Sequence, residues 1–461
     1  MKLFRILTSS LALAGVSMVA NAAAPRYVFY FIGDGMGMGH VMTTQTYNRM
    51  IRKSADPLLM MQFPVASMCM TYSASSPVTD SAAAGTALAC GHKTKNGMLG
   101  MDADSTVVYS ISHDLLQQGY GVGIITSVYQ DDATPGAHYA HVASRKMYYD
   151  IDCHAAESGF QFIGGAGLHG GTVDGQPTDA EQRLTDAGYT IVSSTDGIEQ
   201  INSEKIYLVS PDEERTWNIG YTIDSIPTAL NLPDMTRACL KHLERVTPQK
   251  FFMMVEGGNI DHAAHANDGG AVVKEIINFN EALQVAYDFY LQHPDETLIV
   301  VTADHDTGGM ALNNAARGDK MGLRYIDAQK KSKEEFSAEC KAMLRSRRVY
   351  QWEDMRQMLE DNFGFWSVVP VSDKQTESLK EKFESTFELR NSADQETLYA
   401  SFNAFAVEVF KVLDSYTGIA WTTTSHTGNP VPVFAIGVGA DQFKGLNNNI
   451  EIPGKIMNAV D

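Results

Sequence analysis

The chain has 461 residues, of which 44% are hydrophobic and 20% are charged. These fractions are ordinary for a globular protein, and the length allows one large α/β domain or two smaller ones. The formal net charge of −19 at pH 7 argues against non-specific binding to nucleic acid or to anionic lipid surfaces. It does not exclude an anionic substrate, because bound cations can reverse the sign of a site locally.

The N-terminus has the pattern of a secretory signal. Lys2 and Arg5 precede a mostly apolar stretch that is short for a membrane span, and Ala20-Asn21-Ala22 fits a small-residue cleavage site. We therefore expect residues 1–22 to be a signal peptide and residues 23–461 to be exported to the periplasm or secreted, without a membrane anchor. The mature chain keeps five cysteines, so at least one thiol has no partner within the chain.

Several apolar runs alternate with helical patterns. The runs, which predict buried strands, are Tyr27–Ile32, Gly123–Thr126, Phe251–Val255, Thr297–Thr302 and Val431–Val438. The helical patterns are Ser81–Ala89, Ser110–Gln118 and Gly270–Leu291. Runs rich in Val, Ile and Phe without polar alternation suit a parallel sheet covered on both faces. The fold class expected is α/β, with a doubly wound, mostly parallel central sheet and helices on both faces.

The segment from about residue 313 to 421 differs from the rest. It is rich in Lys, Glu, Gln and Met with helical periodicity, as in Ser332–Arg345 and Asp373–Phe387. We interpret it as a mainly helical insertion before the last core strand, within one catalytic domain that spans residues 23–461. A separate small domain remains an alternative, and the insertion could flank the cleft or cover a dimer surface.

The third of these apolar runs ends in E-G-G-N-I-D-H-A-A-H. This stretch brings Glu256, Asp261, His262 and His265 to the C-terminal tip of a buried strand. Oxygen and imidazole donors at this spacing suit a divalent metal, and this edge of an open α/β sheet is where ligands bind. The alternative is a capped helix with surface histidines.

Other strand ends carry similar residues. Asp34 lies in Gly33-Asp34-Gly35-Met36-Gly37, which lacks the sixth-position glycine of a dinucleotide fingerprint. It suits a metal ligand or a tight turn about equally. Asp304 and His305 follow another predicted strand, and His426 lies just before the final one.

A candidate nucleophile and a candidate anion clamp complete the set. Ser81 opens an alanine-rich helix, whose N-terminal N–H groups favour an anion, although a hydroxyl or carboxylate there is also a routine cap. The segment Asp131–Pro135, placed at the end of a strand, is followed by Arg145. Arginine can hold two oxygens of a phosphate, although a solvent-exposed arginine is the commoner case. His138 and His141 nearby are interpreted as structural.

Taken together, these segments resemble the alkaline phosphatases, in family order along nearly the whole mature chain. The motifs are D-G-M-G, T-D-S-A-A-x-x-T-A, D-A-T-P with a later S-R, E-G-x-x-I-D with a later His, T-A-D-H and H-T-G. Each motif alone is weak, whereas the ordered set is specific. The resemblance implies a phosphoric monoester hydrolase that acts on small phosphate monoesters.

The resemblance also implies roles for individual residues, with two zinc ions and one magnesium ion as cofactors. One zinc ion would be held by Asp261, His265 and His426, and the other by Asp34, Asp304 and His305. Asp34 would bridge to a magnesium ion that Thr134 and Glu256 also bind, with Asp132 beside that ion. Ser81 would form a phosphoserine and Arg145 would clamp the phosphate.

One pair departs from the family pattern. Family members carry Asp/Lys or His/His at the positions of Asp132 and His262, so this chain has a hybrid of the two.

Other functions fit the sequence less well. A metal-dependent phosphodiesterase of the same superfamily would typically lack the magnesium arm and the arginine. A type I sulfatase needs C/S-x-P-x-R, which is absent around Cys69, Cys90 and Ser81. An inactive phosphate-binding protein could dispense with the nucleophile. No nucleic-acid or membrane partner is expected, and a homodimer is compatible with the sequence.

Overall fold

A mixed ten-stranded sheet forms the centre of the computed structural model, which describes residues 24–211, 217–226, 230–313, 322–346 and 348–461. From edge to edge its strands are β18 (Leu446–Asn448), β2 (Val65–Met70), β17 (Val431–Gly437), β10 (Thr297–Thr302), β1 (Tyr27–Ile32), β9 (Phe251–Glu256), β3 (Gly121–Thr126), β4 (Phe162–Gly164), β8 (Lys205–Leu208) and β7 (Tyr189–Val192). The signal peptide predicted at residues 1–22 lies outside the described residues.

The predicted strands form the middle of this sheet. Strands β1, β3, β9 and β10 are buried along their whole length and run parallel to one another, as their unbroken apolar sequences predict. Strand β17 is the exception, because it runs antiparallel to both β10 and β2. The chain enters β17 from His426, at the carboxyl edge of the parallel strands, so β17 must run back from that edge.

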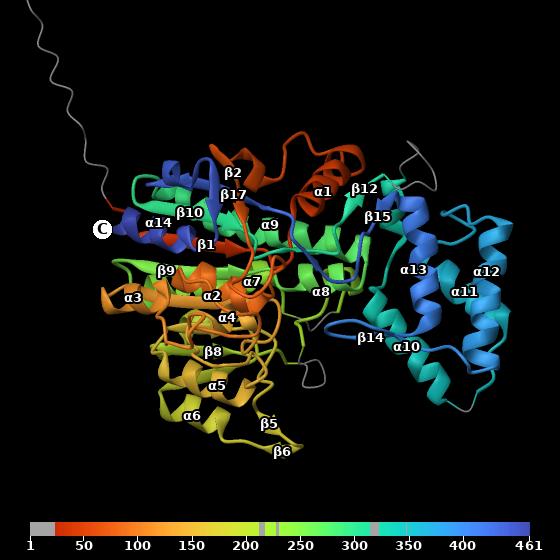
Figure 1. Ribbon diagram of the computed structural model, residues 1–461, viewed down its shortest axis with the longest axis horizontal. Helices are drawn as coiled ribbons and strands as arrows, with labels where there is room; N and C mark the ends of the chain where they lie inside the picture. Colours follow the sequence, from red (N-terminus) through yellow and green to blue (C-terminus); the bar gives the residue numbers. More distant parts are fainter. Residues whose placement is uncertain (1–23, 212–216, 227–229, 314–321, 347) are drawn as a thin grey trace, which may run out of the picture.

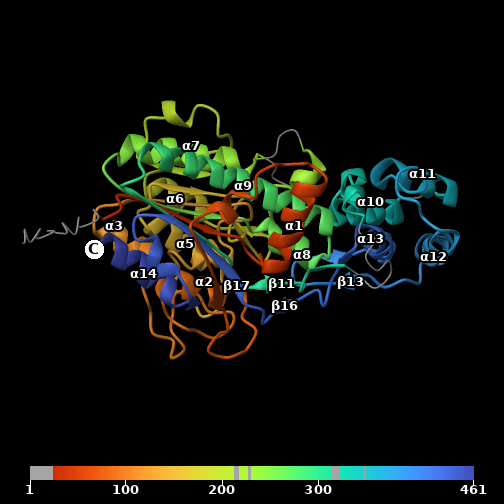
Figure 2. The same cartoon turned by 90° about the horizontal axis from the view of Figure 1, so that it is seen from above.

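Helices cover both faces of the sheet. In Figure 2, α7 (Leu232–Val246) and α9 (Gly269–Gln292) lie on one face, and α2 (Ser81–Cys90) and α14 (Glu451–Val460) lie on the other. The remaining helices of this part are α1 (Met38–Met50), α3 (Ile111–Gln117), α4 (Ala133–Gly136), α5 (Tyr148–Glu157), α6 (Ala180–Asp186) and α8 (Asn259–His265). The predicted α/β fold with a mostly parallel sheet is confirmed.

The register of the sheet aligns the strand ends that carry the candidate site. Ile32 at the end of β1 is paired with Glu256 of β9 on one side and with Thr302 of β10 on the other. Thr126 of β3 is paired with Glu256 in turn. The loops that follow these strands therefore start side by side at one edge of the sheet.

The inserted segment leaves and re-enters the body of the protein, which is the central sheet with its covering helices, at a single point. β12 (Ala311–Leu312) is paired with β15 (Ile419–Ala420), so the two ends of the segment are adjacent. Between them, α10 (Lys333–Arg345), α11 (Trp352–Phe363), α12 (Asp373–Phe383) and α13 (Ala404–Thr417) pack around a hydrophobic cluster of their own, beyond α8 in Figure 1. The mainly helical character expected of this segment is present.

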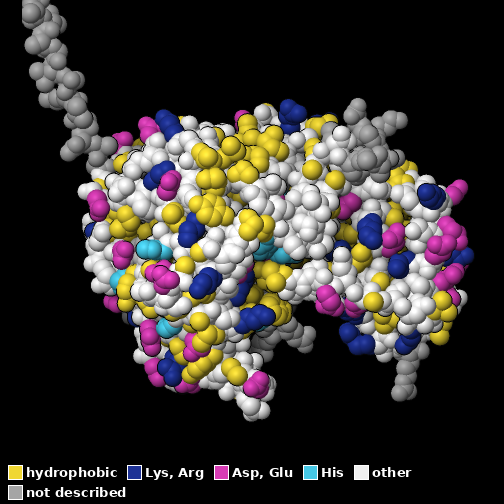
Figure 3. Space-filling view, in the orientation of Figure 1, with side chains coloured by type: hydrophobic (Ala, Val, Ile, Leu, Met, Phe, Trp, Pro, Cys, Tyr) yellow, Lys and Arg dark blue, Asp and Glu magenta, His cyan; other side chains and the backbone are white. Residues whose placement is uncertain are grey.

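Three further observations bear on expectations from the sequence. Cys69, Cys90, Cys153, Cys239 and Cys340 all lie in the described part and are free. No helix within the described ranges is long and apolar enough to cross a membrane. Both acidic and basic side chains lie on the face shown in Figure 3.

Candidate active site

The loops after β1 and β10 bring three predicted metal ligands together. Asp34 follows β1, and Asp304 and His305 follow β10; all three are buried. Gly35, which follows Asp34, has a φ of +69°, and a Cβ there would lie 2.8 Å from Thr307 Oγ1 in the loop after β10 and 2.7 Å from Asp261 Oδ1 of α8 (Asn259–His265). Glycine is therefore required where the two loops meet.

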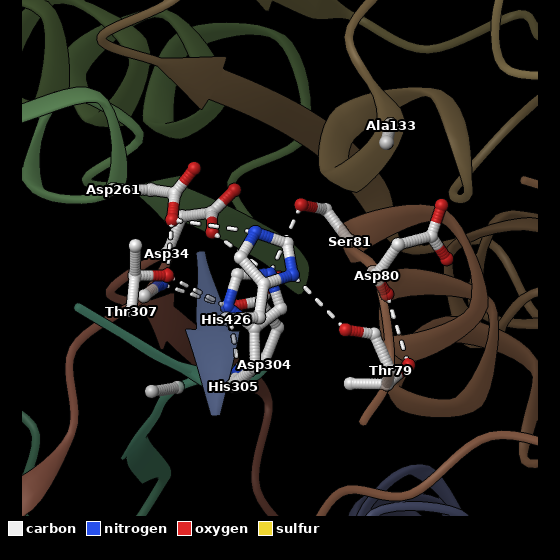
Figure 4. A network of polar contacts seen from close by, with 12 residues as sticks. Asp34, Thr79, Asp80, Ser81, Ala133, Asp261, Asp304, His305, Thr307 and His426 are labelled. Carbon is white, nitrogen blue, oxygen red and sulfur yellow. Dashed lines mark hydrogen bonds and ion pairs between the residues drawn. The ribbon is translucent and has the colours of Figure 1, made fainter. Parts of the chain in front are cut away.

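His305 Nε2 is the point on which these groups converge. It lies 3.4 Å from Asp34 Oδ1, 3.1 Å from Asp304 Oδ2 and 3.1 Å from Ser81 Oγ. Both carboxylate oxygens are buried without a hydrogen-bond partner. Figure 4 shows the three side chains directed toward one another, with Ser81 on the opposite side.

Thr307 fixes the orientation of the His305 ring. Its hydroxyl donates a hydrogen bond to Asp261 Oδ1, so it can only accept from His305 Nδ1, which lies 3.2 Å away. The Nδ1 nitrogen of His305 therefore carries a proton. In the neutral ring, Nε2 then directs a lone pair at the two carboxylates, and a positively charged partner between them would be favourable. A proton or a metal cation can be that partner.

The electrostatics of this pocket favour positive charge. Burial raises the pKa of Asp34, and the charges of Asp304 and Asp261 raise it further. Burial opposes the charged form of His305, but Asp304 and Asp261 outweigh it and raise the pKa of the imidazole. A cation bound between these groups would relieve both the repulsion and the desolvation.

The second predicted ligand set also converges. Asp261 and His265 belong to α8, and His426 reaches the site from β16 (His426–Thr427). His265 Nε2 is 3.4 Å from Asp261 Oδ2 and 2.9 Å from His426 Nε2. His426 Nε2 is 3.8 Å from Asp261 Oδ1.

Backbone carbonyls define the protonation of the two imidazoles. His265 Nδ1 lies 2.6 Å from the carbonyl oxygen of Thr424, and His426 Nδ1 lies 3.0 Å from that of Thr79. Each Nδ1 must therefore donate, and burial lowers the pKa of His426 to about 3. Two Nε2 lone pairs then face each other and Asp261, which is the arrangement of a metal site.

These contacts place the potential ligands in two overlapping groups. Ligand atoms of Asp34, Asp304 and His305 lie within 4.8 Å of one another, and so do those of Asp261, His305 and His426. His305 thus belongs to both groups, whereas the sequence had assigned it to only one of them.

Of the residues predicted for magnesium, Glu256 is the last residue of β9 and Thr134 lies in the short helix α4. Both carboxylate oxygens of Glu256 and the hydroxyl of Thr134 are buried without a hydrogen-bond partner. Burial raises the pKa of Glu256 and the charge of Asp132 adds to that effect, while the Thr134 hydroxyl is near enough to favour the charged form. Unpartnered oxygen atoms of this kind suit a hard cation such as Mg²⁺.

Ser81 is the first residue of α2, and the residue before it shapes the turn. Asp80 caps the helix by accepting from Ala83 N at 3.0 Å, and its other oxygen accepts from Gly97 N at 2.8 Å. Of the two caps that the sequence allowed, a hydroxyl or a carboxylate, the carboxylate of Asp80 is the one found. The hydroxyl of Ser81 is left to face His305, at the positive end of the helix dipole.

Arg145 lies between two carboxylates, and one of them, Asp80, directly precedes Ser81 in the chain. Its Nη2 donates to Asp132 Oδ1 at 2.6 Å, and its Nη1 is 3.9 Å from Asp80 Oδ2. The side chain is only 13% exposed, so it is not the solvent-exposed arginine that the sequence left open.

Asp132 does not end a strand, contrary to expectation. Strand β3 stops at Thr126, and Asp132 instead caps α4 by accepting from Ala133 N at 2.7 Å. Residues 127–131 connect β3 to α4, so the predicted end of the strand at Thr126 is right and the strand expected just before Asp131 is absent. The expectation for His138 holds: it is buried against Ser112, and burial lowers its pKa to about 3.

Comparison with known proteins identifies the family behind this geometry. The sequence profile described as alkaline phosphatase matches residues 25–174 and 166–461. The chain belongs to the alkaline phosphatase family. The function predicted from the motifs, hydrolysis of phosphate monoesters, is therefore confirmed at the level of the family.

Curated and solved relatives cover nearly the whole alkaline phosphatase fold. Alkaline phosphatase 4 of Bacillus subtilis is 28% identical over 94% of this chain and 88% of its own length. Alkaline phosphatase of Schizosaccharomyces pombe is 24% identical over 94% and 80%. The crystal structure of a cold-active alkaline phosphatase from Shewanella sp. has a TM-score of 0.79 at 26% identity, covering 94% of this chain and 99% of that one.

Several residues of this alkaline phosphatase site were missed from the sequence. Thr307 lies two residues after the T-A-D-H motif, so its closeness to His305 in the sequence could have marked it. The carbonyls of Thr79 and Thr424 have no sequence signal. Tyr399 comes from the inserted segment, which matched no motif, and it contacts Arg145 and both histidines of α8.

Proposed function

We propose that this alkaline phosphatase acts through a phosphoserine on Ser81, with two zinc ions and one magnesium ion in the site. The observation that carries the proposal is the convergence of Ser81 Oγ, Asp34 Oδ1 and Asp304 Oδ2 on His305 Nε2. A hydroxyl beside buried, unpartnered carboxylates is the arrangement that a cation would complete.

Donor chemistry supports the choice of metals. We assign one zinc ion to Asp261, His265 and His426, and the other to Asp34, Asp304 and His305. Mixed imidazole and carboxylate donors suit zinc, whereas the oxygen donors Asp34, Thr134 and Glu256 suit magnesium. Among related structures, a TAB5 alkaline phosphatase mutant carries Mg in a site called M3. That structure is 23% identical, so the assignment here depends on this chain's own residues.

When bound, the cations would supply the positive charge that stabilises oxygen anions during an in-line displacement. The residues of the chain do the rest. Arg145 holds two phosphate oxygens and, with the N-terminus of α2, orients phosphorus in line with Ser81 Oγ.

The reaction would proceed by two displacements. Ser81 Oγ loses its proton and forms a bond to phosphorus, while the bond between phosphorus and the alcohol oxygen breaks. The alcohol leaves with a proton. A water molecule then attacks the same phosphorus and the bond to Ser81 Oγ breaks. One proton of the water passes to Ser81 Oγ, which restores the hydroxyl, and inorganic phosphate is released with the other.

The test is hydrolysis of p-nitrophenyl phosphate by the purified, metal-loaded protein. We expect a chelator to abolish activity and zinc plus magnesium to restore it, and a diester substrate to be cleaved far more slowly. Ser81→Ala should lower kcat by about three orders of magnitude or more while leaving the metal content near that of the wild type. Loss of metal in this variant, or a preference for the diester, would overturn the proposal.

A further inference from the structure

Tyr399 is the point at which the inserted segment reaches the active site. It lies in the turn between β13 (Gln395–Glu396) and β14 (Ser401–Phe402), which are paired in a small hairpin. In Figure 1 this hairpin extends from α10 toward α8, the helix that carries Asp261 and His265. None of the motifs in the sequence pointed to it.

The hydroxyl of Tyr399 contacts the guanidinium that we assign to phosphate. Arg145 Nη2 donates to Tyr399 Oη at 3.2 Å, and the same nitrogen donates to Asp132 Oδ1 at 2.6 Å. The Arg145 guanidinium carbon lies 6.0 Å from the centre of the Tyr399 ring. Arg145 is thus held from two directions, by a carboxylate of the body and by a phenol of the insertion.

The ring of Tyr399 packs against the histidines of α8. Its centre lies 4.1 Å from that of His262, with the rings tilted, and 5.3 Å from that of His265 in an edge-on contact. These contacts fix the ring on a helix that is itself part of the metal site. The hydroxyl therefore has a defined position relative to both Arg145 and the ligands.

The hairpin that carries Tyr399 is anchored rather than loose. Thr397 N donates to the carbonyl oxygen of Ala400 at 2.9 Å, which closes the turn around Tyr399. Lys341 of α10 donates to the carbonyl oxygen of Ser401 at 2.5 Å, and Asn403 N donates to Ser337 Oγ at 2.8 Å. An anchored turn can place a side chain with the precision that a binding site needs.

We propose that Tyr399 is a positioning residue that holds Arg145 in the orientation for binding the substrate phosphate. The inference rests on the proposed role of Arg145 as the phosphate clamp. Through Tyr399 the inserted helices become part of the active site, rather than a separate attachment. An arginine restricted before the ligand arrives loses less conformational freedom on binding it.

The experiment removes one hydroxyl and asks whether the effect passes through Arg145. Tyr399→Phe keeps the ring on His262 and His265 but deletes one of the two acceptors for Arg145 Nη2, and Asp132 remains as the other. We measure the Kd for inorganic phosphate by calorimetry, and KM and kcat for p-nitrophenyl phosphate. Because a net hydrogen bond is worth a modest amount, the Kd and KM should rise about 2- to 10-fold, with kcat nearly unchanged.

Two further variants separate positioning from a merely structural role. In an Arg145→Ala background, Tyr399→Phe should have no additional effect on the Kd, because the residue through which it acts is gone. Leu398→Ala, a matched control in the same turn whose side chain is 58% exposed, should match the wild type.

The outcomes distinguish this inference from the proposed function. An unchanged or tighter Kd in Tyr399→Phe, or an effect that persists in the Arg145→Ala background, would overturn the role of Tyr399 alone. If Arg145→Ala itself binds phosphate as tightly as the wild type, the assignment of Arg145 as the clamp fails and this inference fails with it.

Discussion

Thr307 is the residue whose removal tests the proposed metal site most directly. Its hydroxyl joins the two ligand groups, because it donates to Asp261 Oδ1 and accepts from His305 Nδ1 at 3.2 Å. Thr307→Val replaces the hydroxyl with a methyl group of similar size. Asp261 then loses a donor, and His305 loses the acceptor that fixes its ring.

The size of the effect follows from burial. The side chains of Asp261, His305 and Thr307 are all fully buried, so water cannot replace the lost hydrogen bonds. An unsatisfied buried polar group costs about 1–3 kcal/mol, and removing a partner of a metal ligand typically weakens metal binding by about 10- to 100-fold. We therefore expect the affinity for zinc to decrease by about 10- to 100-fold, and kcat/KM to decrease as zinc is lost.

The assay is zinc retention during dialysis against graded chelator concentrations, followed by kcat/KM on p-nitrophenyl phosphate. Thr307→Ser is the matched control, because it keeps the hydroxyl and should retain zinc as the wild type does. If Thr307→Val holds zinc at the same chelator concentration and turns over at the wild-type rate, the relay through Thr307 does not support the site, and the reasoning is refuted.

Two other predictions concern stability and processing. Burial raises the pKa of Glu275 from 4.5 to about 7, so its contribution to stability is complete below pH 4.5 and is lost as the pH rises through about 7. Glu275→Gln keeps the acceptor for Thr222 N, and its melting temperature relative to the wild type should rise from about pH 5 to about pH 8; a constant difference would contradict this. Export with cleavage after Ala22 predicts that the mature protein begins at Ala23. N-terminal sequencing or the intact mass of the exported protein would check this, and an uncleaved N-terminus would contradict it.

The sequence was informative where function depends on strand ends. The apolar runs locate β1, β9 and β10, and the residues after them carry Asp34, Glu256 and Asp304. Because parallel strands end at one edge of the sheet, residues that follow separate apolar runs in the sequence could be predicted to lie close together in space. The short strands β2, β4, β7, β8 and β18 were not predicted, since they are brief or alternate with exposed residues and give weak periodic signals.

What could not be predicted depends on contacts between loops. The carbonyls of Thr79 and Thr424 select the protonated nitrogen of His426 and His265, and any residue type can supply a carbonyl. Tyr399 reaches the site from a segment separated from Arg145 by 254 positions. No local sequence pattern around either residue indicates that the two are in contact, so the contact is seen only in the tertiary structure.

The hybrid pair Asp132 and His262 is where the structure adds most to the sequence. Asp132 does not face an amine across the site; its charge is matched by Arg145 at 2.6 Å. Burial lowers the pKa of His262 to about 4, so the imidazole is neutral at pH 7, and its ring packs against Tyr399. A lysine at this position would add a positive charge that competes with a cation for the nearby carboxylates, whereas a neutral imidazole does not. In the proposed site this pair would combine a carboxylate that orients Arg145 with a neutral imidazole near Asp132 and Asp261, so that no positive charge there competes with a bound cation.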